Sequence, residues 1–397
     1  MRKFVRPGWL SHDLNQETSM LNKKTITPFI AALMAAGSAL PLHAETNFIA
    51  NSFYDAEHPL SKFGYVEWAD TVREISGGDL NPEVYTGTVL LAPRASLQGA
   101  RDNIANVANI AAVYTPSELP VANAVQELGF NYSDPLTAIF AVADFSIHNE
   151  VQQKEWADNG IVYLGAYATP PYILFCSKPV RTLEEIKGKR IRTAGSSVSK
   201  WVEEVGGIPV NVPSSEMYTG LERGTLDCAT NAANDLIDRS LWEVAPYTTE
   251  LSTGMYWSGP EWGFNAGFWS GLTTTQRKQL MDATAHAMSS MVVNYLARSN
   301  AALDEAKAKG NEIYQPSAEL MASVEAFREK VLGDIYTVAE DKYGVADGMS
   351  LIDDFRFTYA KWEGLLENVD RTDIDALDAI ARKEIYGTLD PATYGVN

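Results

Sequence analysis

One arginine occupies a position in the sequence that favours anion binding. Arg192 is near the end of a predicted strand, Lys189 to Thr193, and Gly195-Ser196-Ser197 begins a predicted helix directly after it. Open α/β sheets bind ligands at the carboxyl ends of their strands, where helix N-termini also present unpaired N–H groups. A guanidinium there can hold a carboxylate through two parallel hydrogen bonds. The position alone is equally consistent with an ion pair between Arg192 and a surface glutamate.

The surrounding segment, residues 178–231, predicts two strand-helix units in succession. Thr182 and Glu185 have the spacing of a capping box, and the helix that they begin is expected to stop at Gly188. Further strands are predicted at 208–212 and 226–230, with a helix before each of them. Alternating strands and helices of this length favour parallel pairing. Elsewhere, helices are predicted at 98–109, 118–128 and 151–159.

Short motifs follow one another in a defined order between Lys178 and Leu272. They are Lys178-Pro179-Val180, Ile186-Lys187-Gly188-Lys189-Arg190-Ile191-Arg192, Glu216-Met217-Tyr218-Thr219, Gly224-Thr225-Leu226-Asp227 with Asn231, Trp242 to Tyr247, and Gly263-Phe264-Asn265 with Phe268-Trp269. No single motif is specific, but the ordered set resembles the substrate-binding proteins of TRAP transporters, the DctP family. The resemblance covers roughly residues 48 to 340 and is strongest between 178 and 280.

This resemblance implies an α/β fold of the two-lobe periplasmic binding protein type. Each lobe is expected to be a mostly parallel sheet flanked by helices, with a long helix spanning both lobes. Thr274 to Lys309, a helical pattern without proline, is the candidate for that helix. Lobe I is expected from residues 45–169 and 257–300, and lobe II from residues 170–256 and 301–349.

Residues 350–397 are expected to form a C-terminal helical tail. Its apolar residues Phe355, Tyr359 and Trp362 have near-helical spacing, so one face must be covered. The tail either packs on the body of a monomer or forms a dimer contact through these helices.

The resemblance also implies a ligand site. Arg192 matches the arginine that holds the ligand carboxylate in most such receptors, and Asn231 matches a side chain that often contacts the same ligand. Many members carry a second arginine in the crossover strand, where this chain has Tyr172. A hydroxyl or aromatic partner is therefore more expected here than a second charged group on the ligand. Tyr218, in the helix behind the site, is expected in the pocket wall or in the core.

Eight aromatic residues lie between 242 and 269, and a few of them could line a pocket for an aromatic or branched acid. Trp257 and Trp262 are the best candidates because they lie in a loop rich in Gly, Pro and Ser. Most of the other rings are expected in the core, since aromatic side chains dominate core burial.

The N-terminus is typical of an exported protein. Asn22-Lys23-Lys24 is a basic segment, Ile26 to Leu40 is apolar, and the following residues end in the small residue Ala44. Residues 1–44 are therefore predicted to be a leader with a signal peptide, and Met20 is a candidate for the natural start. The chain that begins near Glu45 is expected in the periplasm of a Gram-negative bacterium.

Composition restricts the partners further. Residues 1–44 hold five basic and two acidic side chains, so the remainder has 27 Lys and Arg against 49 Asp and Glu, a formal charge of −22. Such an excess argues against nucleic acid as a partner. About 350 residues normally form more than one core.

Cys176 and Cys228 are predicted in strands of the same lobe, as a disulfide or as two separate buried thiols.

The sequence contains no phosphate-binding loop, dinucleotide fingerprint or nucleophile elbow. His58, His148 and His286 are widely separated, and none has a metal-ligand spacing. We therefore expect no cofactor, no metal and no enzymatic activity. The resemblance to the DctP family implies a receptor that binds a small organic acid and delivers it to the membrane permease subunits of a TRAP transporter. A receptor of an ABC or sensor system and an exported two-lobe enzyme remain alternatives. The sequence leaves open an aliphatic or aromatic ligand, with one carboxylate or two.

Overall fold

The computed structural model describes residues 45–396, so the predicted leader and the candidate start Met20 lie outside the described residues. A first sheet has the strand order β2-β1-β3-β10-β4. Strand β1 (Thr46–Asn51) runs parallel to both of its neighbours, β2 (Leu80–Tyr85) and β3 (Val107–Ala108). Strand β10 (Gly263–Asn265) is antiparallel to both of its neighbours, β3 and β4 (Ile161–Tyr163). We call this sheet and the helices that share its core lobe I.

The helices of lobe I share one large apolar core with the first sheet. They are α1 (Pro59–Ser61), η1 (Lys62–Val66), α2 (Glu67–Ser76), α3 (Ser96–Arg101), η3 (Ala112–Tyr114), α4 (Pro120–Gln126), η4 (Glu127–Phe130), α5 (Pro135–His148) and α6 (Glu150–Asp158). Helix α2 ends where Gly77 adopts a positive φ of 62°, which glycine reaches without a side-chain clash.

A second sheet has the strand order β11-β9-β5-β8-β6-β7. Its strands are β5 (Ile173–Cys176), β6 (Arg190–Arg192), β7 (Ile208–Val210), β8 (Cys228–Asn231), β9 (Tyr247–Thr249) and β11 (Glu312–Tyr314). Strand β5 is antiparallel to both of its neighbours, and the other pairs are parallel. We call this sheet, with the helices packed on its two faces, lobe II.

The short helices of lobe II confirm the predicted strand-helix units. They are α7 (Leu183–Ile186), α8 (Ser196–Glu204), η5 (Ser214–Glu216), α9 (Met217–Glu222), α10 (Asp235–Asp238) and α11 (Leu241–Val244). The capping box forms as predicted: Thr182 Oγ1 accepts the Glu185 N–H, and the Glu185 carboxylate accepts the Thr182 N–H. This local hydrogen bonding sets where the chain turns toward β6, the strand that carries Arg192.

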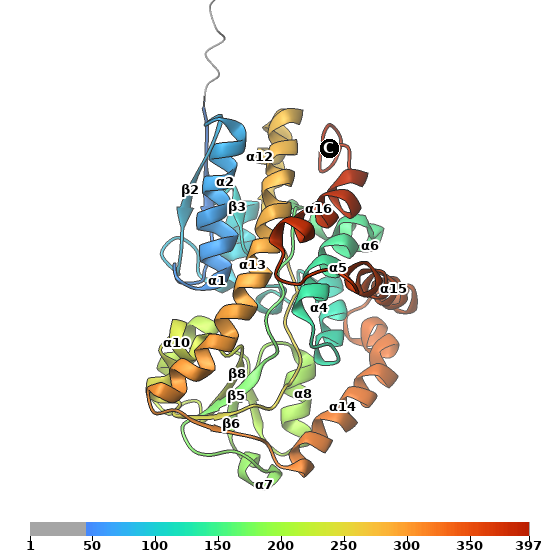
Figure 1. Cartoon of the computed structure of the whole chain (residues 1–397). Coiled ribbons are helices and arrows are strands. Elements are labelled where there is room, and N and C mark those ends of the chain that lie inside the picture. Colours follow the sequence, from blue (N-terminus) through green and yellow to red (C-terminus); the bar gives the residue numbers. More distant parts are fainter. Residues whose placement is uncertain (1–44, 397) are drawn as a thin grey trace, which may run out of the picture. The chain divides into compact units, whose positions relative to one another are not determined.

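The two lobes are joined by crossover segments and by long helices. The crossovers pair with each other, since the Thr169 N–H donates to Tyr256 O and the Tyr172 N–H donates to Gly254 O. Helix α13 (Thr274–Ala308) buries most of its apolar residues between Leu280 and Tyr295 in the core of lobe I, and its last turns pack in lobe II. Figure 1 shows its length relative to the other helices. The expected spanning helix is therefore confirmed.

The C-terminal helices pack on lobe I. Helix α14 (Ala318–Thr337) leads back from the core of lobe II through the π-helical turn η6 (Val338–Lys342). Helix α15 (Gly348–Leu366) then packs on α5, and α16 (Ile374–Glu384) packs on α13. The apolar stripe of α15, including Phe355, Tyr359 and Trp362, is buried in the lobe I core. This stripe is covered within one chain and does not need a second copy.

The two-lobe α/β fold class is confirmed, with three differences in detail. Both sheets are mixed rather than mostly parallel, because β10 in lobe I and β5 in lobe II run against their neighbours. The helix predicted at 98–109 was wrong in its second half, where the chain enters β3. Helix α5 was not predicted, because nearly all of its side chains are buried and its sequence has no polar face. Within residues 45–396, no helix is long and apolar enough to cross a membrane.

Candidate functional site

A cavity lies where side chains from both lobes meet. It comprises about 320 Å³ of space that atoms do not fill, including open solvent. Lobe I and the crossovers supply most of the lining, and lobe II supplies the arginine. The lining residues are Tyr54, His58, Ala111, Val113, Tyr114, Thr169, Tyr172, Arg192, Ala194, Ser214, Asn231, Tyr256 and Tyr295. All of the polar ones are buried, so the structure presents the cavity closed.

Arg192 is the cation of this cavity. It ends β6, at the carboxyl edge of the sheet, and its side chain is 1% exposed. The guanidinium donates from Nε to Val212 O (3.0 Å), from Nη1 to Thr230 O (3.1 Å) and from Nη2 to the Tyr114 hydroxyl (3.3 Å). A guanidinium has five N–H groups, so one remains on each terminal nitrogen. Among residues 45–396, no carboxylate forms an ion pair with it.

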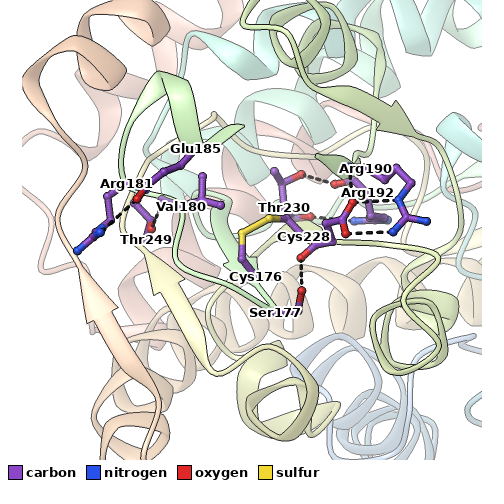
Figure 2. Close-up of a disulfide and its surroundings, with 11 residues drawn as sticks. Cys176, Ser177, Val180, Arg181, Glu185, Arg190, Arg192, Cys228, Thr230 and Thr249 are labelled. Atoms are coloured by element: carbon purple, nitrogen blue, oxygen red, sulfur yellow. Dashed lines mark hydrogen bonds and ion pairs between the residues drawn. A yellow bond between two sulfur atoms is a disulfide. The ribbon is translucent and has the colours of Figure 1, made fainter. Parts of the chain in front are cut away.

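Arg190 precedes Arg192 by two residues on β6 and has a different environment. It is partly exposed and pairs with the Asp227 carboxylate, with 2.9 Å between Nε and Oδ2. Figure 2 shows Arg190 and Arg192 together with Thr230 on the neighbouring strand. The two arginines of one strand thus separate into an ion-paired surface residue and a buried residue without a carboxylate partner.

Tyr114 of η3 connects the lobes at this arginine. Its hydroxyl oxygen accepts the Arg192 Nη2–H and also the backbone N–H of Ser214, the latter at 3.0 Å. With both interactions at its oxygen, the hydroxyl can still donate its own hydrogen to a ligand. Sequence reasoning missed Tyr114 because it lies in an Ala-Val-Tyr segment with no motif, far from Arg192 along the chain.

Asn231 lines the cavity and donates its side-chain N–H to the Asp235 carboxylate. Asp235 Oδ1 lies 3.4 Å from His58 Nε2 of lobe I, and Asp235 Oδ2 lies 3.1 Å from Arg239 Nε. Burial favours a higher pKa for Asp235, but Arg239, His58 and Arg192 outweigh it and hold the pKa below its usual value. Asp235 is therefore ionised. Of this group, only Asn231 was predicted.

Tyrosines form much of the remaining lining. Burial raises the pKa of Tyr172, although Arg192 opposes the rise. Burial also raises the pKa of Tyr54 and of Tyr295, and the neighbouring phenols add to the effect. These hydroxyls therefore lie within electrostatic range of one another and stay protonated. Tyr172 lines the cavity together with Arg192.

The other three predicted residues lie outside this lining. Tyr218 is partly exposed, and its hydroxyl donates to Glu243 at 2.9 Å. Trp257 is buried against Tyr132 and Phe355. Trp262 is buried in lobe I, where Nε1 donates to Gly64 O at 2.8 Å. A loop rich in Gly and Pro therefore did not indicate exposure to a ligand, because it lies between the sheet and the helices.

A larger hollow lies between α8 and α14, but its chemistry is less specific. It comprises about 990 Å³ of space, including open solvent, and charges of both signs line it, among them Lys200, Glu203, Lys330 and Asp334. Lys330 pairs with Glu204 beside it. This hollow has no buried cation without a counter-ion, so the Arg192 cavity is the better candidate site.

Cys176 and Cys228 form a disulfide, which decides between the two alternatives left open by the sequence. The residues face each other across the antiparallel pair β5 and β8, and Figure 2 shows the bond between the sulfurs. The same pair of strands ends in Ile173 opposite Asn231 at the cavity. The bridge therefore joins two strands that reach the candidate site.

Comparison with family models gives one match. The model of bacterial extracellular solute-binding protein, family 7 (DctP) matches residues 51–337. This range includes every strand except most of β1, both crossovers and every residue that lines the cavity.

Two curated relatives and one solved structure illustrate the similarity. A solute-binding protein of Albidiferax ferrireducens is 26% identical over 48% of this chain and 55% of its own length. The ectoine-binding periplasmic protein TeaA of Halomonas elongata is 26% identical over 42% of this chain and 48% of its own length. The chain thus spans about half the length of these relatives. A TRAP solute-binding protein of an unidentified marine microbe, specific for aromatic acids and solved with metahydroxyphenylacetate, has a TM-score of 0.71 at 20% identity, covering 80% of this chain and 100% of its own. At that identity the likeness concerns the fold.

Proposed function

Because the chain belongs to the bacterial extracellular solute-binding proteins of family 7, we propose that it is a receptor for a small organic acid, which it carries to a TRAP-type membrane permease. The carboxylate of the acid binds Arg192 inside the closed cavity, with Tyr114, Tyr172 and Asn231 beside it. Tyr218, Trp257 and Trp262 are not part of this proposed site, because they lie outside the cavity lining.

The observation that carries the proposal is the state of Arg192. A guanidinium in the interior costs several kcal/mol unless an anion compensates it. Here three neutral oxygens satisfy part of the group, while two N–H groups remain, one on each terminal nitrogen. Two parallel N–H donors match the two oxygens of a carboxylate. A ligand carboxylate would therefore supply the missing negative charge.

Residues of both lobes form the site, so a bound ligand can favour the closed state of the lobes. Arg192 and Ser214 come from lobe II, whereas Tyr114, Tyr54 and His58 come from lobe I. A carboxylate on Arg192 would thus interact with groups of both lobes only when these lie together. The ligand favours the closed state by its difference in affinity for the closed and open states. Exclusion of water strengthens the ion pair, although desolvation offsets part of the gain.

The ligands named for two similar proteins support an acid as the ligand of this chain. Ectoine and metahydroxyphenylacetate, the ligands named for two of them, each carry one carboxylate. Delivery to a permease, export by a signal peptide in residues 1–44, a periplasmic location and the absence of enzymatic activity belong to the same proposal. They rest on the family and on the leader-like sequence.

Calorimetric titration of residues 45–397 with a panel of organic acids tests the proposal, with sugars and amines as negative controls. Arg192→Met should weaken acid binding at least tenfold, about 1.4 kcal/mol. Arg190→Met is the matched control, since it removes the other arginine of β6 together with a surface ion pair. It should leave the affinity unchanged. If Arg192→Met bound acids as tightly as the unaltered protein, Arg192 would not be the carboxylate anchor.

A further inference from the structure

The buried charged groups around the cavity leave one positive charge without a negative partner. Arg192, Arg239 and Asp235 are its buried ionised groups. His58, which touches Asp235 through Nε2, accepts the Leu60 N–H at Nδ1. Its ring therefore lies with Nδ1 as an acceptor toward Leu60 and with Nε2 toward Asp235. Two buried cations and one buried anion leave a single positive charge.

The next charged groups do not change this count. Asp238 forms an ion pair with Arg298 at 2.6 Å, so the pair is neutral. Burial raises the pKa of Glu261 well above its usual value, so a negative charge on this carboxyl is disfavoured. Asp55 pairs with Arg239, but its side chain is 62% exposed and water screens it. Arg94, which lies over the Tyr114 ring, is exposed as well.

The cavity also holds polar groups that have no partner in the described chain. Ser214 Oγ is buried and makes no hydrogen bond within residues 45–396. Tyr54 and Tyr295, two phenols, line the same cavity. Each buried group left unpaired costs about 1–3 kcal/mol. A ligand that is apolar beyond its carboxylate would leave Ser214 Oγ in that state and would offer the two phenols no partner.

We propose that the cavity selects a singly charged carboxylate that carries a hydroxyl or another neutral hydrogen-bonding group, and that it discriminates against dicarboxylates. The inference rests on the proposed function and specifies its ligand class. The one excess positive charge binds the carboxylate, and Tyr54, Tyr295 and Ser214 meet the neutral polar group. Tyrosine rings and the His58 ring, which stacks on Tyr54 at 4.3 Å between centroids, enclose the carbon skeleton.

A second carboxylate would meet the wrong charge. Asp235 lies directly behind the lining, bound to Asn231 and His58, and would repel it. Arg239 cannot fully neutralise the charge of a ligand carboxylate, because its Nε already donates a hydrogen bond to the Asp235 carboxylate. A buried carboxylate without a cation costs far more than an unpaired hydroxyl. Charge, more than size, therefore separates the two ligand classes.

Matched acids test the inference on residues 45–397 by calorimetric titration. One series is 4-hydroxybenzoate, benzoate and terephthalate, and the other is 4-hydroxybutyrate, butyrate and succinate. In each series that binds, the hydroxy acid should bind at least tenfold more tightly than the dicarboxylate, and also more tightly than the unsubstituted acid. A dicarboxylate that binds as tightly as its hydroxy acid would overturn the inference while leaving the acid receptor intact. Failure of all six acids and of the wider acid panel would overturn both.

Two variants separate charge from fit. Asp235→Asn raises the net charge of the cavity by one at nearly constant size, so it should shift the dicarboxylate-to-hydroxy-acid affinity ratio at least tenfold toward the dicarboxylate. Asp238→Asn is the control, because it removes another buried carboxylate of α10 that pairs with Arg298, and the ratio should stay as in the unaltered protein. An unchanged ratio in a folded Asp235→Asn protein would contradict the charge argument. If that variant does not fold, the comparison of the six acids decides alone.

Discussion

The hydroxyl oxygen of Tyr114 in lobe I lies 3.3 Å from Nη2 of Arg192 in lobe II. The same oxygen accepts the Ser214 N–H of lobe II. One oxygen atom of lobe I therefore accepts hydrogen bonds from two donors of lobe II, and one of these donors is Arg192, which we propose as the carboxylate anchor. The contact between the lobes and the hydrogen bonding of the arginine therefore depend on the same hydroxyl.

Tyr114→Phe should weaken ligand binding because it removes the oxygen shared by Arg192 and Ser214 in the closed state. We expect a loss of about 1–2 kcal/mol in binding free energy. Calorimetric titration with the tightest acid of the panel measures it. Tyr386→Phe is the control, since its buried hydroxyl donates to Leu164 O within lobe I. The control should lower stability and leave affinity unchanged; equal affinities of all three proteins would refute the role given to Tyr114.

Glu127 forms a second contact between the lobes, and Glu127→Gln should weaken it. Its carboxylate accepts Lys342 Nζ at 2.9 Å, the Tyr343 hydroxyl, and the Ser197 hydroxyl at the start of α8. Burial favours a higher pKa, but Lys342 and the two hydroxyls outweigh it, so the pKa of Glu127 lies below its usual value. We expect Glu127→Gln to cost about 1–3 kcal/mol of unfolding free energy at pH 7.

The sign of the pH dependence follows from this lowered pKa. The ionised carboxylate stabilises the fold above the pKa of an unfolded glutamate, about 4.3, and this contribution is lost as the pH falls through the folded pKa. Urea unfolding at several pH values should therefore show a constant difference between the unaltered protein and Glu127→Gln from pH 7 to about 5, shrinking below about 4. A difference that grew on acidification would contradict the assignment.

Loss of the disulfide should lower stability more than affinity. Cys176 and Cys228 are 52 residues apart, and the chain-entropy estimate for such a loop is about 4 kcal/mol. The bridge lies at the end of β5 and β8 away from Ile173 and Asn231, so the cavity should keep its geometry. Denaturant unfolding of the Cys176→Ala, Cys228→Ala double variant measures the loss. An affinity reduced tenfold in the folded double variant would show that the bridge also positions the site.

Asp144 of α5 anchors the C-terminal helix α15. Its carboxylate accepts Lys361 Nζ and Trp362 Nε1, both at 2.8 Å, and lies 2.8 Å from His148 Nδ1. The hydrogen bond to Asp144 raises the pKa of His148, and burial only partly opposes the rise. This stabilisation is therefore fully present below the usual histidine pKa of about 6.5 and is lost as the pH rises through the folded pKa.

His148→Gln should consequently reduce stability at pH 6 but not at pH 9. Because the imidazole is partly exposed, we expect a difference under about 1 kcal/mol at pH 6. Thermal unfolding across this pH range measures it, and His286→Gln serves as a comparison, since His286 forms a longer contact with Asp378 at 3.8 Å. An effect of His148→Gln that persisted unchanged at pH 9 would mean that packing, and not the charge, is responsible.

Local patterns predicted the part of the site that lies on one segment. The capping box at Thr182, the positive φ of Gly188 and the alternation of strands and helices place Arg192 at the carboxyl end of β6. Each of these signals depends on neighbours within a few residues, which is the range over which caps and turns act. The positions of Asn231 and Tyr172 at the cavity followed from the resemblance to the family.

The sequence by itself determined the strand-helix units, the long helical segment of α13 and the strand end at which Arg192 lies, because periodicity and capping are short-range properties. The two-lobe class followed from the chain length and the resemblance to the family. Only the tertiary structure decided which side chains face that arginine. Tyr54, His58, Tyr114 and Tyr295 come from separate elements of lobe I and the long helix, and no local pattern marks them. It also decided that Trp257 and Trp262 are core residues and that the two cysteines pair. Burial and long-range pairing depend on how distant segments pack, which the residue types of one segment do not specify.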